Sequence, residues 1–564
     1  MSRGLARIVF LVTAVFFAAF FLWPIAQILK GGFVDADGHF TLAFLTTLLR
    51  DPLYQQGLVN SFWIACGTLM ATTAIAVPLA FITDRFRFPG KSLLTSLILV
   101  PIVLPPFVGA IGIKQIFGQY GALNALIVAL HLRPYGWSYD WFMQHRMAGI
   151  IAIEALSLYP ILYLNTVAAL ANIDPAMDEA AQNLGGTAWR RFWRITLPLM
   201  RPGLFAGGTI IFIWAFTELG VPLMFDYQRV TSVQIFQGLK DIGANPIPYT
   251  LVTLMLAATV TLYAIGKGLF GQAGHAMMAK ATTSGGAKTL TPARGWACTL
   301  AFATVTFLAV LPHLGVILVS FASDWYRSVF PAQFTLNNFQ AALGHEITVP
   351  AIANSLKFSS LSTLVDLVLG LAIAYVIVRT KIVGRQVLDF VAMLPLAVPG
   401  IVLAFGYLAM SQEGKFFSFI NPVDNPTVLL VVAYALRRLP YVVRSAMAGF
   451  EQTSVTLEEA AQNLGATPLR ALARVTLPLV FANLIAGGLL AFAFAMLEVS
   501  DSIFLAQKQV FFPITKAIFE LYQLLGDGKF LASALGVWAM AFLAITIIGA
   551  SIILGKRLGA LFRV

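Results

Sequence analysis

The sequence predicts an all-α polytopic membrane protein of about twelve transmembrane helices, arranged as two pseudo-symmetric halves of six. Three observations carry this prediction. The chain is 59% hydrophobic and only 11% charged, whereas soluble domains carry about 25% charged residues. Apolar runs that reach the ~20 residues needed to span a bilayer as a helix recur along all 564 residues. The second half of the chain also repeats sequence of the first.

The apolar runs place the spans in two sets of six. The first set is expected at residues 8–29, 60–82, 93–117, 148–171, 204–225 and 250–271. The second set is expected at residues 296–320, 354–378, 387–410, 427–449, 482–505 and 532–555. The run at 8–29 is too long for a signal peptide and lacks a small-residue cleavage site, so we interpret it as the first membrane helix.

The net charge of +12 does not indicate nucleic-acid binding, because the basic residues collect in alternate short loops. Such loops retain positive charge on the cytoplasmic side of a membrane. The clusters are Arg3/Arg7, Arg85/Arg87/Lys91, Arg190/Arg191/Arg194/Arg201, Arg379/Lys381/Arg385 and Lys556/Arg557/Arg563. With these clusters inside, an even number of spans places both termini in the cytoplasm.

The internal repeat defines the expected domains. Asn60-Ser61 recurs as Asn354-Ser355, 294 residues later, and LVPIVLPPFVGAIG at 99–112 matches MLPLAVPGIVLAFG at 393–406 with the same separation. Two halves in the same orientation imply a two-fold axis along the membrane normal. We therefore expect a first half at 1–271, a flexible cytoplasmic linker rich in Gly, Ala, Ser and Thr at 272–294, and a second half at 295–564.

Further along, the repeat separation falls to 280 residues, as EAAQNLGGTAWRRFWRITLPL at 179–199 matches the segment that ends at Leu479. The first half must therefore contain extra residues after Gly112. The aromatic segment 131–147 is the expected position of this insertion.

A loop motif, E-A-A-x3-G-x9-[IV]-x-L-P, occurs once in each half, within 174–200 and 453–480. Its members are Glu179, Ala180, Ala181, Gly185, Ile195, Leu197 and Pro198, and then Glu459, Ala460, Ala461, Gly465, Val475, Leu477 and Pro478. Asp174-Pro175 is typical of a helix start, and the two glycines predict a tight bend at the end of a short helix. A basic loop lying on anionic lipid is the alternative, and two copies at matching places disfavour it.

The motif resembles the cytoplasmic EAA loop of bacterial ABC importer permeases, in the fused two-half, binding-protein-dependent type I family. The ferric-iron transport permeases are the most similar group. The resemblance implies that Glu179, Ala180, Ala181 and Gly185, with Glu459, Ala460, Ala461 and Gly465, dock two copies of an ABC ATPase subunit. It also implies a multi-pass protein of the inner (plasma) membrane, a periplasmic substrate-binding protein as partner, and ATP-Mg bound by the ATPase subunits.

The chain itself is not expected to be an enzyme or to hold a cofactor. The nearest fragment to a phosphate-binding G-x4-G-K-[ST] loop is Gly90-Lys91-Ser92, but Arg85 stands where the first glycine is required. Cys66 and Cys298 lie in separate apolar runs and are interpreted as small apolar side chains, with no disulfide or metal site.

Ionisable residues inside spans suggest function, because burying them in a bilayer is costly. Glu218 and Glu498 occupy equivalent positions in spans five and eleven. They are candidates for the translocation pathway, or alternatively each forms a structural hydrogen bond at a helix break, and the sequence leaves both open. Glu154 and Asp366 have no acidic counterpart, which favours interhelical hydrogen bonds. The prolines of the third and ninth spans, at 101, 105, 106, 395 and 399, predict kinks, with gate hinges as the alternative.

The resemblance implies ferric iron as cargo, while phosphonate, sugar-phosphate and thiamine importers share the architecture. An ion-coupled secondary transporter is the alternative class, but it would have no partner loops. A membrane-embedded enzyme is a third class, for which the sequence contains no motif.

Overall fold

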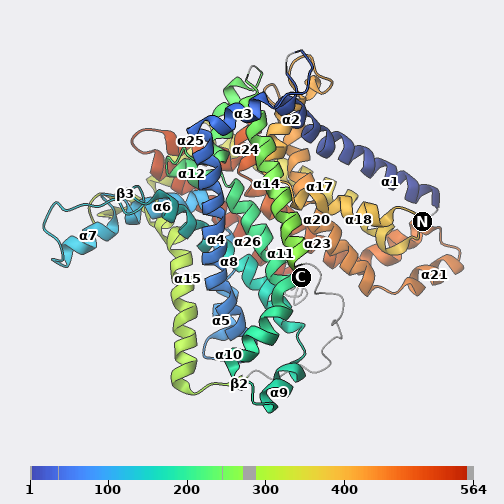
Figure 1. Ribbon diagram of the computed structural model, residues 1–564, viewed down its shortest axis with the longest axis horizontal. Helices are drawn as coiled ribbons and strands as arrows, with labels where there is room; N and C mark the ends of the chain where they lie inside the picture. The colour runs from blue at the N-terminus through green and yellow to red at the C-terminus, as the bar shows by residue number, and fades with distance from the viewer. Residues whose placement is uncertain (1–2, 36, 104, 244, 271–287, 555–564) are drawn as a thin grey trace. The chain divides into compact units, whose positions relative to one another are not determined.

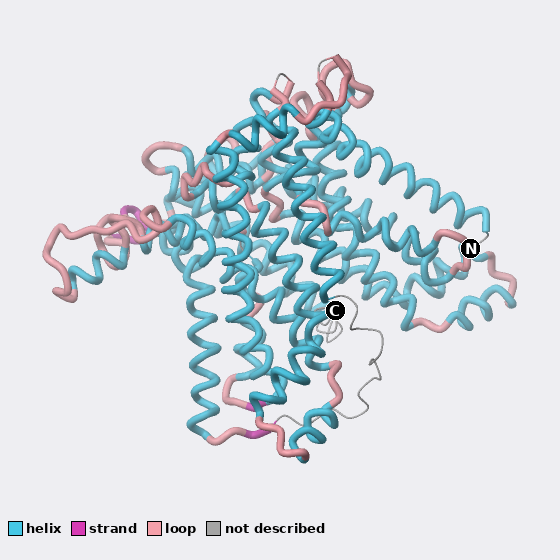
Figure 2. Tube along the Cα trace, viewed as in Figure 1, coloured by secondary structure: helices cyan, strands magenta, loops and turns pink. Residues whose placement is uncertain are grey.

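The computed structural model describes residues 3–35, 37–103, 105–243, 245–270 and 288–554. Helices form almost all of the regular structure (Figure 2). Within the described ranges, strands are limited to two short pairs: β1 (Phe86–Arg87) runs parallel to β2 (Lys288–Thr289), and β3 (Ala322–Asp324) runs antiparallel to β4 (Gln333–Phe334). The predicted all-α class is confirmed. Most of the predicted linker at 272–294 lies outside the described residues, as does the basic cluster after residue 555.

The chain forms two compact units that do not coincide with the two sequence halves. Of the described residues, unit 1 contains those within 3–55, 234–257 and 339–554, and unit 2 contains those within 56–233, 258–270 and 288–338. Each unit therefore combines most helices of one half with the first membrane helix of the other half.

Unit 1 is built from helices of both halves, several of which are visible in Figure 1. They are α1 (Arg3–Phe17), η1 (Ala18–Leu22), α2 (Trp23–Phe33), α3 (Ala43–Arg50), α16 (Asn337–Gly344), α17 (Thr348–Arg379), α18 (Arg385–Met393), η6 (Leu394–Leu396), α19 (Gly400–Met410), η7 (Ser418–Ile420), α20 (Thr427–Gln452), α21 (Val455–Asn463), α22 (Pro468–Ala471), η8 (Leu472–Thr476), α23 (Leu477–Met496), α24 (Ser500–Leu505), η9 (Gln509–Phe511), α25 (Ile514–Gln523) and α26 (Gly528–Leu554).

Unit 2 has the corresponding set. It contains α5 (Lys91–Leu97), η2 (Val100–Val103), α6 (Pro106–Phe117), α7 (Ala122–Ala129), α8 (Arg146–Ala171), α9 (Pro175–Asn183), α10 (Ala188–Arg191), η3 (Phe192–Thr196), α11 (Leu197–Thr217), α12 (Gly220–Met224) and α15 (Pro292–Phe321). The chain passes between the units within α4 (Pro52–Arg85), α13 (Thr231–Gln237) and α14 (Ile247–Phe270) and at the start of α16, and η4 (Gly238–Asp241) lies in unit 1.

Among the described residues, nine helices are long and apolar enough to cross a membrane, and two bent helix pairs raise the number to eleven. The predicted count of twelve is therefore not confirmed. The span expected at 427–449 is occupied by α20, which is long enough but carries Arg437, Arg438 and Arg444 within its length. The other eleven predicted spans overlap these helices and pairs, although the span expected at 482–505 runs past the end of α23 at Met496.

The third and ninth predicted spans, at 93–117 and 387–410, are not single kinked helices. In each half the chain turns sharply, by 98° between residues 385–396 and 400–410 and by 100° at the matching place in the first half. Proline explains the break. Pro105 and Pro399 are the residues just before α6 and α19, and each has an extended backbone. Neither has the N–H that would continue the preceding helix. The chain therefore bends much more sharply here than the predicted kink in a continuous helix would require.

Small residues allow the helices of each unit to pack closely, as in membrane bundles generally. In unit 1, α17, α20 and α23 pack together. A β-carbon on Gly370 would lie 2.8 Å from Val442, and one on Gly487 would lie 2.7 Å from Ser445. In unit 2, α8 and α11 make the equivalent contact through Gly207, which leaves no room for a side chain against Leu162.

The first membrane helix of each half packs against the third span of the other half. In unit 1, α2 packs against α19, and the Tyr407 hydroxyl donates a hydrogen bond of 2.9 Å to the Phe20 carbonyl. In unit 2, α15 packs against α6, where Gly112 faces the backbone of Gly315. Nothing in the periodicity of the sequence predicted this exchange.

The segment between α6 and α8 contains the extra residues of the first half. Asn124 of α7 organises it, because its amide donates to the carbonyl of Tyr139 and its Oδ1 accepts from the Trp141 indole, at 2.7 and 2.8 Å. The aromatic part of this insertion is therefore an ordered loop.

Candidate functional site

The first EAA loop (174–200) is a helix–turn–helix whose first helix is capped at its N-terminus and ended by a glycine. The Asp174 carboxylate caps α9 by accepting from the Ala176 N–H at 2.9 Å. Gly185 has a φ of +79°, a conformation that favours glycine, and the N–H of the next residue, Gly186, donates to the Ala181 carbonyl at 2.9 Å. The bend that the sequence predicted is present, with the geometry of a helix ended by a left-handed residue.

The second EAA loop (453–480) repeats this geometry. Ser454 caps α21 by accepting from the Thr456 N–H at 3.3 Å, and Gly465 has a φ of +90°. In both loops a threonine, Thr187 or Thr467, then caps the next helix. That helix continues through a five-residue π-helical segment, η3 or η8, into α11 or α23. Single π-helical turns of this kind are frequent at functional sites.

The two loops expose the same positions. Glu179 and Ala180 are exposed in α9, as are Glu459 and Ala460 in α21, and the second alanine of each motif is half-buried. The leucine before each glycine is almost fully exposed, at 90% for Leu184 and 89% for Leu464. The same apolar side chain is therefore exposed at equivalent positions of the two loops.

The acidic residue just before each motif glutamate is turned away from solvent and attaches the loop to a neighbouring helix. In unit 2, the Asp178 carboxylate lies 3.4 Å from Arg85 at the end of α4 and 3.0 Å from Arg191 of α10. In unit 1, the Glu458 carboxylate lies 3.3 Å from Arg379 at the end of α17 and accepts from the Thr476 hydroxyl at 2.9 Å. We call these contacts the first and second loop anchors.

Sequence reasoning missed the loop anchors, although a signal was present. Asp178 and Glu458 are separated by the same 280 residues as the motif glutamates, and Arg85 and Arg379 by the 294 residues of the earlier repeat. The arginines had been interpreted only as topology signals. The second anchor is more buried, with Arg379 and Glu458 side chains 6% exposed, and the Tyr375 hydroxyl also donates to Glu458 at 3.1 Å.

The loops differ beyond the bend. In the first, Trp189 and Trp193 pack edge to face with ring centroids 5.5 Å apart, and Phe192 packs beside both. The second loop has Leu469 and Ala473 at the positions of the two tryptophans. The exposed face of the short helix is therefore the same in both loops, but the side chains around it differ between the first loop and the second.

Glu218 and Glu498 each lie at a helix break. Glu218 follows the end of α11, and its Oε1 accepts from the N–H groups of Gly220 and Val221, at 3.0 and 3.3 Å, at the start of α12. Glu498 occupies the same break between α23 and α24 and accepts from the Asp501 N–H at 3.4 Å. These are the hydrogen bonds expected if each glutamate stabilises a helix break. A role for Glu218 and Glu498 in the translocation pathway stays a prediction.

The second break is also held by buried charges. In unit 1, Arg437 Nη1 lies 2.7 Å from the Glu498 carboxylate and 3.2 Å from that of Asp501. Arg438 donates to Glu498 as well, and also to the Phe494 carbonyl at 2.9 Å. Both arginines come from α20, which explains why a helix with this charge can lie inside the unit. The residues at the equivalent positions of the first half are Ser157 and Leu158.

The two unmatched carboxylates have different surroundings. Glu154 of α8 is 1% exposed and accepts the expected interhelical hydrogen bond, from the Thr68 hydroxyl of α4 at 3.3 Å. Asp366 of α17 is equally buried, but neither of its oxygens accepts a hydrogen bond from any residue in the described ranges. The expectation of an interhelical hydrogen bond is therefore confirmed for Glu154 and wrong for Asp366.

Comparison with known proteins decides the family. Residues 76–273 and 366–560 each match the family described as binding-protein-dependent transport system inner membrane component. The chain belongs to this family. One match lies in each half of the chain, and each contains an EAA loop and a helix break at an acidic residue. The chain is thus the permease component of a binding-protein-dependent ABC importer, a multi-pass inner-membrane protein.

Three relatives illustrate the range of this family. A putative ferric transport system permease protein of Haemophilus influenzae is 25% identical over 89% of this chain and 78% of its own length. A ferric transport system permease protein of Actinobacillus pleuropneumoniae is 23% identical over 88% of this chain and 70% of its own. A putative 2-aminoethylphosphonate transport system permease protein of Salmonella choleraesuis is 26% identical over 43% of this chain and 84% of its own.

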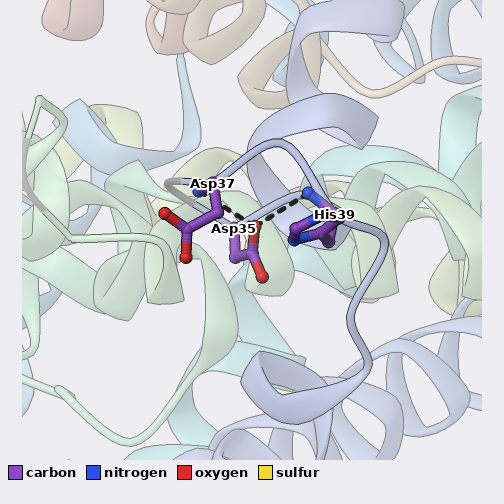
Figure 3. Close-up of side chains that lie close together, drawn as sticks. All are labelled: Asp35, Asp37 and His39. Carbon is purple, nitrogen blue, oxygen red and sulfur yellow. Dashed lines mark hydrogen bonds between the residues drawn. The ribbon is translucent and has the colours of Figure 1, made fainter.

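Three side chains of metal-ligand type gather on the turn between α2 and α3 of this permease. Asp35, Asp37 and His39 offer ligand atoms within 4.8 Å of one another (Figure 3). The Asp35 carboxylate accepts from the backbone N–H groups of Asp37 and His39, at 3.1 and 2.8 Å. Asp37 and His39 are exposed. An aspartate that bonds the backbone two residues ahead is a common way to close a turn, and this role accounts for the cluster.

Proposed function

We propose that this permease engages two copies of an ABC ATPase subunit, one through each EAA loop. The observation that carries the proposal is the repeated exposed face of α9 and α21. Glu179, Ala180 and Leu184 on one face, and Glu459, Ala460 and Leu464 on the other, are exposed at matching positions. ATP and Mg²⁺ would be bound by the ATPase subunits, and both EAA loops and both termini would be cytoplasmic.

The loops are connected to the membrane helices in a way suited to transmitting movement. Each continues directly into α11 or α23, which ends at the break containing Glu218 or Glu498. The loop anchors attach each short helix to the end of α4 or α17 as well. A displacement of α9 or α21 would therefore move two membrane helices at once, which a loop lying on lipid would not require.

We propose ferric iron as the cargo, delivered by a periplasmic substrate-binding protein. Two relatives that match almost the whole chain are named as ferric transport permeases. The phosphonate-type relative matches one half only, so phosphonate, with sugar-phosphate and thiamine, is the second candidate. Family membership favours the ABC importer over an ion-coupled secondary transporter.

Subunit stoichiometry tests the docking proposal. Leu184→Asp or Leu464→Asp should each leave a complex with one ATPase subunit per permease, and the double variant should leave none, as measured by native mass spectrometry. Both leucines are exposed, so the fold should be retained. Val383→Asp is the matched control, because Val383 is fully exposed in another predicted cytoplasmic loop. Two ATPase subunits retained by the double variant would refute the proposal.

Uptake into proteoliposomes tests the cargo. The permease with its ATPase should import radioactive ferric iron from the iron-loaded binding protein, only when ATP is present on the ATPase side. Uptake of 2-aminoethylphosphonate, a sugar phosphate or thiamine instead would assign the second candidate. Transport driven by an ion gradient without any ATPase would contradict the importer class.

A further inference from the structure

A polar pocket of about 780 Å³ lies in unit 2, away from the EAA loop. Its lining consists of Gln56 and Asn60 from the first turns of α4, Arg146 from the start of α8, and Asp226, Tyr227, Gln228 and Arg229 from the loop after α12, so that two arginines stand against one carboxylate. Gln56 and Arg229 are exposed, and Arg146 and Tyr227 are half-buried. No part of the proposed docking or cargo assignment uses these residues.

The course of the helices places the pocket at the opposite end of unit 2 from the EAA loop. The helix α8 begins at Arg146 in the pocket and ends at Ala171, just before the loop. Its 26 residues correspond to about 39 Å at 1.5 Å per residue, which is close to the full thickness of a bilayer. The helix α4 runs from the pocket to Arg85, which belongs to the first loop anchor. If the loop is cytoplasmic, the pocket opens to the outside.

The positive charge of the pocket is held in place without being neutralised. Arg146 Nη1 donates to the Asp226 backbone carbonyl at 2.7 Å, and Arg229 Nη1 donates to Gln56 Oε1 at 3.0 Å. Both acceptors are neutral, and no acidic side chain in the described ranges forms an ion pair with either arginine. The Asp226 carboxylate itself lies 3.9 Å from Lys114 Nζ. Two oriented guanidinium groups therefore remain available to a carboxylate.

Tyr227 lies close to both arginines. Burial raises the pKa of its hydroxyl, and the nearby charges of Arg229 and Arg146 oppose that rise. The loop that carries Tyr227 is held by α4. Asn60 Nδ2 donates to the Arg229 carbonyl at 2.9 Å, and Ser61 Oγ accepts from the Thr231 N–H at 3.0 Å. The pocket is thus built on the Asn-Ser pair that the sequence repeats in both halves.

The matching loop of unit 1 has the same support but not the same charge. Asn354 Nδ2 donates to the Phe512 carbonyl at 3.3 Å, and Ser355 Oγ accepts from the Ile514 N–H at 2.7 Å. By this hydrogen-bond register Phe512 stands where Arg229 does, and Pro426 occupies the position of Arg146. The nearby Lys508 forms an ion pair with Asp424 at 3.3 Å.

We propose that the pocket receives a carboxylate side chain of the periplasmic substrate-binding protein, and this inference rests on the proposed orientation and function. A protein side chain suits the site better than a small ligand, because small-ligand pockets are enclosed and mostly apolar, whereas all the lining residues here are polar and several are exposed. Guanidinium groups are suited to bidentate binding of carboxylate. Arg146 and Arg229 of the first half would then form an ion pair with that carboxylate of the binding protein.

Binding of the iron-loaded substrate-binding protein to the intact permease–ATPase complex in nanodiscs tests this inference. Arg229→Glu should weaken the affinity at least tenfold and make it less sensitive to salt, because a charge attraction has become a repulsion. Arg229→Lys should retain part of the affinity. Lys508→Glu is the matched control, since it reverses a charge on the corresponding loop of unit 1, and it should change the affinity less than threefold.

Other results overturn the inference. Unchanged affinity in Arg229→Glu and in Arg146→Gln would show that the pocket does not contact the binding protein. An equal loss in Lys508→Glu would indicate general charge attraction. Unchanged affinity with an increased KM for transport would assign the pocket to an anionic cargo. A wild-type complex that neither binds the binding protein nor transports iron would overturn the proposed function itself.

Discussion

Gly112 of α6 lies directly against Gly315 of α15, so that a β-carbon on Gly315 would come within 2.8 Å of the Gly112 Cα. The equivalent contact in unit 1 is made by Gly406 of α19, whose β-carbon would lie 2.8 Å from Pro24 of α2. Both glycines permit the first membrane helix of one half to pack closely on the third span of the other. The close approach depends on the absence of a side chain in α6 and α19.

Filling either contact should therefore destabilise the permease. Gly112→Val and Gly406→Val should each lower the free energy of unfolding by roughly 1–3 kcal/mol, as overpacking does in other tight interiors, and the Tm in detergent should fall accordingly. Gly268→Val is the control, because Gly268 is exposed in α14 with nothing within 4 Å of its β-carbon position. Equal Tm values for all three variants would show that the contact is loose.

The two loop anchors should differ in their sensitivity to mutation. Arg379→Gln leaves Glu458 buried without its ion pair, which typically costs about 3–5 kcal/mol. Arg85→Gln should cost less, because Arg85 and Asp178 are 24% and 17% exposed and Arg191 still pairs with Asp178. The Tm and the ratio of transport to ATP hydrolysis should both fall more in Arg379→Gln. A larger loss in Arg85→Gln would contradict this ranking.

Glutamine substitution separates the two interpretations of the acidic helix breaks. Glu218→Gln retains an Oε1 that can accept from Gly220 and Val221, so its Tm should stay close to that of the wild type. Glu498→Gln removes the negative charge beside Arg437 and Arg438, and should cost about 3 kcal/mol. Lost transport in a stable Glu218→Gln variant would assign Glu218 to the pathway, and normal transport would leave it a structural cap.

The glycine bends should be necessary for coupling. Gly185→Val or Gly465→Val forces a side chain into a left-handed conformation at a cost of roughly 1–2 kcal/mol, and should reorient the exposed face of α9 or α21. We expect ATP hydrolysis without proportionate transport, with the permease still inserted. Gly414→Val is matched in strain, because Gly414 has a φ of +78° and open space around it, but it lies outside both EAA loops. Coupling lost equally in Gly414→Val would count against the docking role.

The parts of the structure that depend on neighbouring residues could be predicted from the sequence. The cap at Asp174 and the bend at Gly185 both follow from short-range chemistry that a single sequence contains, and the change in repeat separation gave the position of the insertion but not its ordered structure. The repeat located both EAA loops for the same reason. The helix class followed from apolar runs longer than any soluble core helix requires.

Features that depend on contacts between distant segments could not be predicted. The sequence shows Arg437 and Arg438 inside a predicted span, but not that Glu498 and Asp501 lie beside them. Pro399 indicated a kink, but not a bend of 98° or the packing of α19 against α2. The repeat separations single out Asp178 and Glu458 in the sequence, but not their pairing with the arginines at the ends of α4 and α17.

The packing of α2 on α19 has a consequence for how the protein is made. The hydrogen bond from Tyr407 to the Phe20 carbonyl joins residues 387 positions apart. At a synthesis rate of roughly 5–20 residues per second, the N-terminal helix must wait about 20–80 s for its partner to leave the ribosome. During that interval α2 can already pack on α14, where Gly31 and Gly32 lie against Tyr249 and Thr253. The face of α2 that packs on α19 must therefore be covered by lipid, or by an insertion factor, until the ninth predicted span has been synthesised.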